Sequence, residues 1–262
     1  MIHVIESFTC PKTGIAEKNE DMLYVGEHFV AVVDGSTSQG IITGKSEGRL
    51  TAELIVGALD RLPYDSDGAS AVAFLQNELA DYLKGKENID LGAVAVIYSI
   101  ARKEIWLIGD CQCAINGKVH TNAKEVDVIM AAMRSMLIQS LLAQGYTEKD
   151  LLKHDISRDM IEPLLKEQTH LRNIIGGYGY PCLCGKKEVT QFSVFQVNAG
   201  DEVILASDGY PRLFSTLAQS EQALKKLIEV DPLLYREYHS TKGLRPGNVG
   251  FDDRTYIRFV VD

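Results

Sequence analysis

The amino-acid sequence predicts a layered α+β domain, and three features of its pattern lead to this fold class. Strand-like apolar runs open the chain, return in its middle and close it. Segments with apolar residues at helical spacing lie between these groups of strands. The helical segments come in pairs, whereas a parallel βαβ sheet would place one helix after each strand. No internal repeat or linker divides the 262 residues, so residues 1–262 are predicted to form one domain.

The first strands and helices can be placed from local signals. Residues 22–25 and 28–33 are apolar runs separated by a Gly-Glu turn, which predicts a hairpin whose second strand is buried. Helices are predicted around residues 53–59 and 71–83, because Asp67-Gly68 and a nearby proline interrupt the pattern between them.

The middle of the chain predicts a second pair of strands and then a helical block. Residues 93–98 and 104–108 are strand-like runs, and Asn116-Gly117 is a strong signal for a tight turn. Residues 124–170 have apolar side chains at helical spacing, and one face of this block is predicted to fill the core. That face consists of Val126, Ile129, Met130, Met133, Met136, Leu137 and Leu141.

The last part of the chain returns to strands. Residues 189–197 partly alternate between apolar and polar side chains, and residues 202–206 form a short apolar run. A short helix is predicted at residues 221–230. Residues 255–261 are predicted to be the final strand.

Composition excludes several classes of protein. The chain is 45% hydrophobic and 24% charged, which is ordinary for a folded globular protein. Its net charge of −9 argues against a basic nucleic-acid surface. No stretch is expected to provide the roughly 20 apolar residues that a membrane span needs. A polar N-terminal start and an odd count of five cysteines predict a cytoplasmic protein with reduced thiols. The oligomeric state stays open.

Two cysteine pairs invite a zinc interpretation. Cys111-x-Cys113 and Cys182-x-Cys184 each have one residue between the cysteines. Zinc sites usually separate such ligands by about two to four residues. Buried free thiols are therefore the better interpretation.

Acidic residues stand where the predicted strands begin or end. Asp34, Asp110 and Asp208 each follow an apolar run, Asp252-Asp253 precedes the last strand, and Glu20-Asp21 precedes the first hairpin. Any single Asp-Gly pair is most often only a turn. Five acidic positions at strand boundaries are harder to explain in that way, because strands of facing sheets can bring their ends to one edge.

Carboxylates gathered at one edge would form a cation site. They repel one another unless a cation neutralises them, and ligands that are all oxygen select hard ions such as Mg²⁺ or Mn²⁺ over Zn²⁺. Two such ions about 3.5–4 Å apart can hold an attacking hydroxide and stabilise a displaced oxygen. The acidic pattern therefore favours metal-assisted hydrolysis.

Five motifs, taken together in their order, extend this interpretation over nearly the whole chain. They are Asn19-Glu20-Asp21, Val33-Asp34-Gly35, Gly109-Asp110, Ser207-Asp208-Gly209 and Asp252-Asp253-Arg254-Thr255. Each is weak alone, but the ordered set resembles the metal-dependent serine/threonine phosphatases of type 2C. The resemblance implies a four-layer α-β-β-α sandwich, in which helical pairs flank two antiparallel sheets.

The resemblance also implies a ligand set for two ions, Mn²⁺ or Mg²⁺. Asp34 is similar to the carboxylate that bridges the two metals, and the Gly35 carbonyl is similar to a ligand of one of them. Asp208 and Asp252 are similar to ligands of the other metal. The implied nucleophile is a hydroxide that bridges the metals, and the implied substrate is a phosphorylated protein.

Three further acidic residues receive roles from the same resemblance. Glu20 and Asp21 resemble the pair that holds metal-bound water. Asp110 resembles the residue that, together with Asp208, binds a third and weaker metal ion.

The chain departs from the family pattern in its substrate-binding positions. The family has an Arg that grips the substrate phosphate, and the matching position here is Ala16. Lys12 or Lys18 is the candidate substitute, although lysine lacks the forked geometry of arginine. The loop over residues 36–40 lacks a family-type histidine, and Cys111 follows the Gly-Asp motif where the family often has serine.

These departures keep two other functions open. One is a catalytically weak or inactive domain of the same fold that binds a partner or a phosphorylated ligand. The other is an actin-like ATPase, which the run from Asp34 to Ser38 superficially resembles. The retained set of carboxylates favours the active phosphatase, and the lack of a second glycine-rich phosphate motif disfavours the ATPase.

Overall fold

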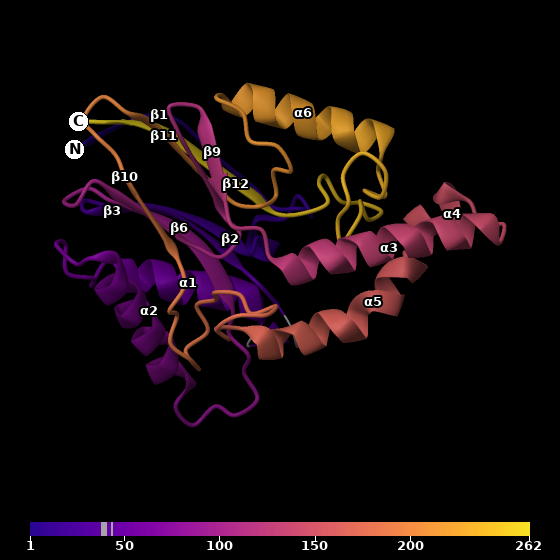
Figure 1. Ribbon diagram of the computed structural model, residues 1–262, viewed down its shortest axis with the longest axis horizontal. Helices are drawn as coiled ribbons and strands as arrows, with labels where there is room; N and C mark the ends of the chain where they lie inside the picture. Colours follow the sequence, from indigo (N-terminus) through magenta and orange to yellow (C-terminus); the bar gives the residue numbers. More distant parts are fainter. Residues whose placement is uncertain (38–40, 43) are drawn as a thin grey trace.

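Two five-stranded antiparallel sheets pack face to face in the computed structural model, which describes residues 1–37, 41–42 and 44–262 (Figure 1). The sequence interpretation of Ser38, Gln39 and Gly40 lies outside the described residues. Helices lie on the outer sides of the sheets, so the α+β sandwich predicted from the sequence is confirmed.

The first sheet has the strand order β1-β12-β11-β8-β9. Its strands are β1 (Ile2–Cys10), β12 (Arg254–Val261), β11 (Glu202–Ala206), β8 (Gln112–Ile115) and β9 (Lys118–Thr121). Asn116 and Gly117 connect β8 to β9 with φ angles of 50° and 81°. Positive φ at both central residues is typical of the tight hairpin turn that the sequence predicts.

The second sheet has the strand order β10-β7-β6-β3-β2. Its strands are β10 (Ser193–Gln196), β7 (Glu104–Ile108), β6 (Ala93–Ser99), β3 (Phe29–Gly35) and β2 (Asp21–Val25). The antiparallel pairing of β2 with β3 confirms the first predicted hairpin. A short ribbon, β4 (Ile41–Ile42) with β5 (Lys45–Ser46), leads into the first helix.

Strand β3 explains why its sequence is almost continuously apolar. Val30 and Val32 point into the core between the two sheets, where they join residues such as Phe259. Ala31 and Val33 alternate with them and point into the core under the helices on the other side. A strand that is buried on both faces has no solvent-facing position for a polar side chain.

Three helices form the outer layers. Helices α1 (Glu47–Leu59) and α2 (Gly68–Leu83) cover the second sheet, and α6 (Leu217–Val230) lies over the first sheet (Figure 1). Each begins at a side chain that accepts a hydrogen bond from the helix backbone, as stable N-termini do; the caps are Ser46, Asp67 and Thr216.

The remaining helices project beyond the end of the sandwich. Helix α3 (Glu125–Ala143) packs against α5 (Ile156–Glu167), and the short α4 (Glu148–Lys153) joins them (Figure 1). Two single 3₁₀ turns complete the fold, η1 (Ala16–Lys18) before β2 and η2 (Gln168–Leu171) after α5.

The methionine-rich face of α3, predicted to fill the core, does so only in part. Val126 and Leu141 are buried, whereas Ile129 is 38% exposed and Met136 is 59% exposed. The buried face includes Arg134, whose guanidinium donates hydrogen bonds to the carbonyls of Leu233 and Ser240 and pairs with Asp155. Helix α3 directs Arg134 inward because main-chain carbonyls of the neighbouring loop require donors, and Ile129 and Met136 face outward instead.

Helix α3 also differs from expectation in its length and composition. Among the helices of the described residues, α3 alone is long enough and apolar enough to cross a membrane. The sequence was not expected to contain such a stretch. A helix of a folded domain can pass the same test. The buried guanidinium of Arg134 and the packing against α5 belong to such a domain.

We expect Arg134→Ala to reduce the free energy of unfolding by about 3–5 kcal/mol, because it leaves the Asp155 carboxylate and two carbonyls without their donor. Met136→Ala on the same helix should change it by no more than about 0.5 kcal/mol, since that side chain is largely exposed. Urea unfolding followed by circular dichroism measures both. Equal losses would contradict the inward orientation of Arg134.

Candidate active site

The ends of the second sheet's strands bring three aspartates together. Asp21 opens β2 and lies directly opposite Asp34 of β3 in the strand register. Asp110 follows the end of β7, after Gly109 has turned the chain with a φ of 82°. The acidic residues that mark strand boundaries in the sequence therefore lie at one end of the sheet in the structure.

The first sheet contributes acidic residues to the same edge. Asp208 lies just beyond β11, and Asp252 and Asp253 lie just before β12. Ser207 joins the two sheets at this point: its hydroxyl donates to Asp21 Oδ2 at 2.6 Å, and it accepts from the Thr255 N–H at 2.9 Å. This hydroxyl fixes the acidic end of one sheet against that of the other.

Two glycines are needed here for packing. A Cβ added at Gly35 would lie 2.0 Å from the Gly48 carbonyl oxygen, and one added at Gly209 would lie 2.0 Å from the Asp253 carbonyl oxygen. At Gly35, whose carbonyl is the ligand that the resemblance implies, the close approach of the first turn of α1 leaves no room for a side chain.

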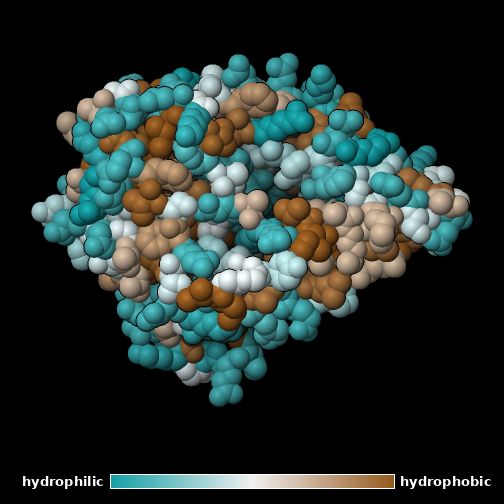
Figure 2. Space-filling model, viewed as in Figure 1, coloured by the Kyte–Doolittle hydropathy of each residue, from teal (hydrophilic) through white to brown (hydrophobic). Residues whose placement is uncertain are grey.

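The acidic residues line or adjoin a cavity of about 670 Å³. Figure 2 shows a hollow in the middle of the viewed face, with hydrophilic side chains in it and apolar side chains of the α3 region beside it. Cations line the same cavity as the carboxylates, and they are Lys12, Lys124, Arg158, Lys166, Arg172, Lys242 and Arg245. The site therefore combines both signs of charge.

Asp21, Asp34 and Asp208, here called the central trio, have carboxylates without an ion-pair partner among the described residues. Asp21 is 2% exposed, and Asp34 and Asp208 line the cavity. One oxygen of Asp21 and one of Asp208 are buried and accept no hydrogen bond from any described residue.

The pKa values of the central trio follow from this enclosure. Burial, and then repulsion from Asp252, Asp253 and Asp208, raises the pKa of Asp21 to about 8, although the Ser207 hydroxyl opposes the shift. Burial together with neighbouring carboxylates raises the pKa of Asp208 to about 7, and the same causes raise the pKa of Asp34 well above its ordinary value. Burial and mutual repulsion destabilise the ionised form of the trio, and a bound cation would offset both effects.

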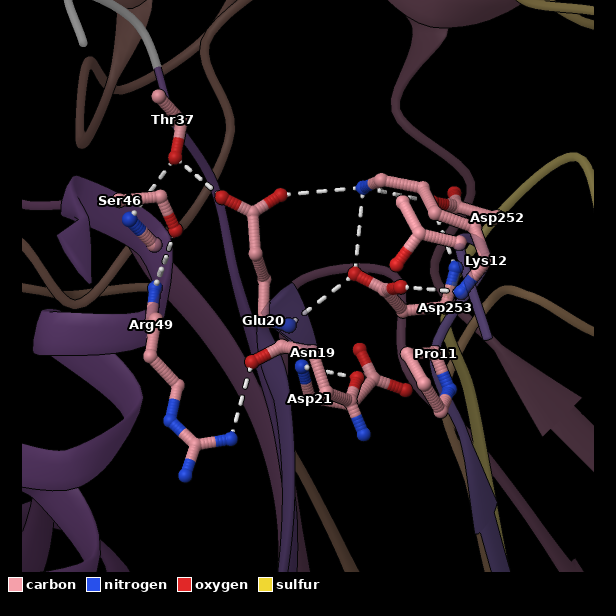
Figure 3. A network of polar contacts seen from close by, with 12 residues as sticks. Pro11, Lys12, Asn19, Glu20, Asp21, Thr37, Ser46, Arg49, Asp252 and Asp253 are labelled. Carbon is pink, nitrogen blue, oxygen red and sulfur yellow. Dashed lines mark hydrogen bonds and ion pairs between the residues drawn. The ribbon is translucent and has the colours of Figure 1, made fainter. Parts of the chain in front are cut away.

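The outer carboxylates, in contrast, already have ammonium partners. Lys12 Nζ lies 3.1 Å from Glu20, 3.6 Å from Asp252 and 3.2 Å from Asp253 (Figure 3). The Lys12 backbone N–H also donates to Asp253 at 2.6 Å. Burial alone would lower the pKa of this ammonium, but Asp252, Glu20 and Asp253 together raise it above its ordinary value.

Lys242 and Lys124 each pair with a carboxylate of the cavity. Lys242 pairs with Asp252, and Lys124 Nζ lies 3.0 Å from Asp110. Burial would raise the pKa of Asp252, but Lys242 and Lys12 outweigh it and leave that pKa below its ordinary value. Neither lysine was predicted from the sequence, since neither lies in a motif and only the fold brings them near the carboxylates.

The two predicted phosphate-binding lysines occupy different places. Lys12 lies within the site, whereas Lys18 is exposed on η1 and does not line the cavity. Ala16, which stands where the family has arginine, is exposed on the same turn. Of the two candidates, the structure therefore brings only Lys12 to the carboxylates.

The donor set fits a hard divalent cation. All its atoms are oxygens, and three buried carboxylate oxygens, one each of Asp21, Asp110 and Asp208, lack a partner among the described residues, which is the environment that Mg²⁺ or Mn²⁺ prefers. Within the described residues, no three His, Cys, Asp or Glu side chains already stand in the arrangement of a metal site. Coordination therefore requires the carboxylates of the trio to turn toward the ion.

Comparison by sequence gives no match to a family model or to a curated protein. Comparison by structure gives several. The catalytic domain of the serine/threonine protein phosphatase PstP, described in complex with two manganese ions, matches 100% of both chains with 18% identity and a TM-score of 0.52. The PstP/Ppp phosphatase of Mycobacterium tuberculosis matches equally well.

A third solved structure extends the result. The PPM Ser-Thr phosphatase MsPP from Mycobacterium smegmatis, described in complex with cacodylate, covers 99% of this chain with 14% identity and a TM-score of 0.50. These similarities confirm that the chain has the fold of type 2C phosphatases, as its motifs imply. At such identities they concern the fold alone.

We expect Asp208→Asn to stabilise the metal-free protein by roughly 1–2 kcal/mol at pH 8, because it removes a charge that burial and neighbouring carboxylates disfavour. Asp201→Asn is the matched control, for which the free energy of unfolding should change in the opposite direction. The pKa of Asp201 is lowered by the amide of Asn116 and the backbone N–H of Asn198, so its neutralisation should destabilise. Unfolding in the presence of a chelator measures both, and stabilisation by both variants would contradict the assignment.

Proposed function

We propose that the chain is a metal-dependent phosphomonoester hydrolase that acts on phosphoserine or phosphothreonine in proteins. The observation that carries the proposal is the central trio: three carboxylates from the ends of β2, β3 and β11 share one enclosure, and none has an ion pair with a described residue. The fold shared with solved serine/threonine phosphatases supports the substrate class.

The residues that would hold the ions are those of the shared acidic edge. Asp34 and Asp208 from the trio, Asp252 and the Gly35 carbonyl are the proposed ligands, with Glu20, Asp21 and Asp110 around them. When bound, Mn²⁺ or Mg²⁺ lowers the pKa of water toward neutrality and offsets the negative charge of phosphate oxygens.

The chain's own cations would bind and orient the substrate. Lys12 lies at the cavity wall with its ammonium among Glu20, Asp252 and Asp253, so its position is fixed from several sides. We propose that it contacts the phosphate in place of the arginine that Ala16 replaces. Lysine is a point charge, so it would attract the phosphate without fixing its rotation.

Two arginines that line the cavity support anion binding. Arg158 and Arg245 line the cavity, and the pKa of Arg158 is lowered by burial and by the charge of Arg245, although its partner Glu162 opposes the shift. An anion bound near Arg158 would offset the charge of Arg245. A phosphate or an acidic side chain of the substrate fits this place.

One observation favours a second candidate, a domain that binds a phosphorylated ligand without turnover. Lys12 and Lys242 already neutralise Asp252, which the type 2C pattern uses as a metal ligand. A site that satisfies its outer carboxylates with ammonium groups needs fewer metal ions. Binding of a phosphoserine peptide without hydrolysis in Mn²⁺ would identify this candidate.

We expect hydrolysis of p-nitrophenyl phosphate that requires Mn²⁺ or Mg²⁺ and stops when a chelator is added. Asp34→Ala and Asp208→Ala should each reduce kcat by about 100-fold or more, because each removes a proposed ligand. A phosphoserine peptide should be hydrolysed and its phosphotyrosine counterpart should not. Activity that survives chelation or both substitutions would eliminate the proposal.

We expect Lys12→Met to lower kcat/KM by about tenfold, because one desolvated contact between an ammonium and a phosphate stabilises by about 1–2 kcal/mol. Lys18→Met is the matched control, since Lys18 is exposed and lies outside the cavity. Steady-state kinetics on the phosphoserine peptide compares the two variants. Equal losses, or a loss confined to Lys18→Met, would remove Lys12 from substrate binding.

A further inference from the structure

Two cysteine pairs of identical spacing lie in different environments. Cys111 and Cys113 are buried in the core between the sheets. Burial and the nearby Asp34 and Asp110 raise the pKa of Cys111 well above its ordinary value, and burial raises the pKa of Cys113 to about 12. Thiols held in their neutral form are poor nucleophiles, so this pair is inert.

The second pair is held side by side by the backbone. The N–H and the carbonyl of Leu183 bond to Ala93 of β6 at 2.8 Å and 3.0 Å, and the Leu183 side chain points into the core under α1 and α2. Cys182 and Cys184 therefore share the opposite face of this extended segment. The Cys182 thiol donates to the Leu183 carbonyl at 3.8 Å, and its interaction with the Cys184 thiol raises the pKa of Cys182 and lowers that of Cys184.

Cys184 Sγ lies among donors that stabilise a thiolate. The neighbouring Cys182 thiol lowers its pKa most, and the backbone N–H groups of Lys186 and Lys187 and the charge of Arg172 add to this against the effect of burial. The resulting pKa is about 6. The Asn173 side-chain amide donates to the same sulfur at 3.5 Å.

A cavity adjoins Cys184, which is itself 2% exposed, so only a small molecule could reach its sulfur. The cavity has a volume of about 450 Å³, and Cys184 lines it together with Lys166, Lys187, His170 and Glu167. Asp90 also lines it, and its carboxylate pairs with Arg172 at 2.9 Å and with Lys186 at 2.7 Å. The remaining charge around the sulfur is positive, which favours the thiolate and an entering anion.

We propose that Cys184 is a reactive thiolate which a hydroperoxide oxidises, and that Cys182 resolves the product to an intrachain disulfide. The sulfur of Cys184 attacks the terminal oxygen of the hydroperoxide, the O–O bond breaks, and the leaving alkoxide, or hydroxide where the oxidant is hydrogen peroxide, takes a proton from solvent to become an alcohol or water. The sulfur of Cys182 then attacks the sulfenic acid, the S–O bond breaks, and water leaves with the Cys182 proton. Two thiols lose two electrons, and the peroxide gains them.

Closure of the disulfide would act on the neighbouring active site. Two residues apart in an extended chain, the Cα atoms lie about 6.6 Å apart, near the upper limit of about 6.8 Å for a disulfide. The segment must therefore contract around Leu183. Its partner Ala93 pairs with Gly35 in the register, and the Gly92 carbonyl accepts from the Ser36 N–H at 2.8 Å. The expected effect of the disulfide on turnover rests on the proposed function. The oxidation of the two thiols is independent of that function.

Peptide mass spectrometry tests the chemistry directly. The reduced native protein is treated with hydrogen peroxide, blocked with N-ethylmaleimide and digested with trypsin. Residues 173–186 form one tryptic peptide with both reactive cysteines, and residues 104–118 form another with the inert pair. We expect the first peptide to lose two hydrogens and remain unblocked, while the second stays reduced.

Variants separate the two sulfurs. Cys182→Ser should stop at a sulfenic acid on Cys184 that dimedone captures, and Cys184→Ser should leave Cys182 reduced. Alkylation of Cys184 by iodoacetamide should be at least tenfold faster at pH 7 than that of Cys111 or Cys113, with a half-maximal rate near pH 6. Circular dichroism confirms that each variant is folded.

Several results would overturn the proposal. A reduced 173–186 peptide after peroxide treatment, oxidation of Cys111 and Cys113 at the same rate, or sulfinic acid on Cys184 with Cys182 unreacted each contradict it. Retention of a soft metal ion by both thiols, seen in native mass spectrometry, would also do so. A disulfide that forms without any change in phosphatase turnover would reject the coupling to the active site.

Discussion

The arrangement of the site depends on the polar bonds that join the ends of the two sheets, and the hydroxyl of Ser207 is the central one. It accepts from the backbone of Thr255 within the first sheet and donates to Asp21 of the second sheet. Together with the Glu20 N–H, which donates to Asp253 at 3.1 Å, it holds the ends of β11 and β12 against the end of β2, and Asp34 lies opposite Asp21 in the strand register. Packing of two sheets brings their surfaces together, but a directional bond of this kind fixes which ends coincide.

Because the strand ends meet at one edge, several carboxylates lie in one enclosure and repel one another. The structure deals with this repulsion differently for the outer and the central carboxylates. The outer carboxylates Glu20, Asp252 and Asp253 receive ammonium partners from Lys12 and Lys242. The central trio receives none from the described residues, and its pKa values rise as a result. A fold that needed only stability would gain from apolar side chains at these positions. The retained charge supports the cation site proposed above.

The sequence predicts the parts of this structure that have local or periodic signals. The β2–β3 hairpin, the tight turn at Asn116-Gly117 and the acidic strand ends follow from patterns within a few residues. The buried face of α3 does not, because its orientation depends on the carbonyls that Arg134 reaches almost 100 residues further along the chain. The positions of Lys124 and Lys242 are likewise set by tertiary contacts that no local spacing encodes.

The chemistry of the cysteines likewise cannot be predicted from local sequence patterns. Both pairs share one spacing, and the sequence gives the same interpretation, buried thiols, for each. One pair lies beside aspartates in a dry core, whereas the other lies beside Arg172 and two backbone N–H groups at the wall of a basic cavity. The same residue type is therefore protonated in one place and ionised in the other. Reactivity in this protein is a property of the surroundings that the fold builds, as it is for the carboxylates a few strands away.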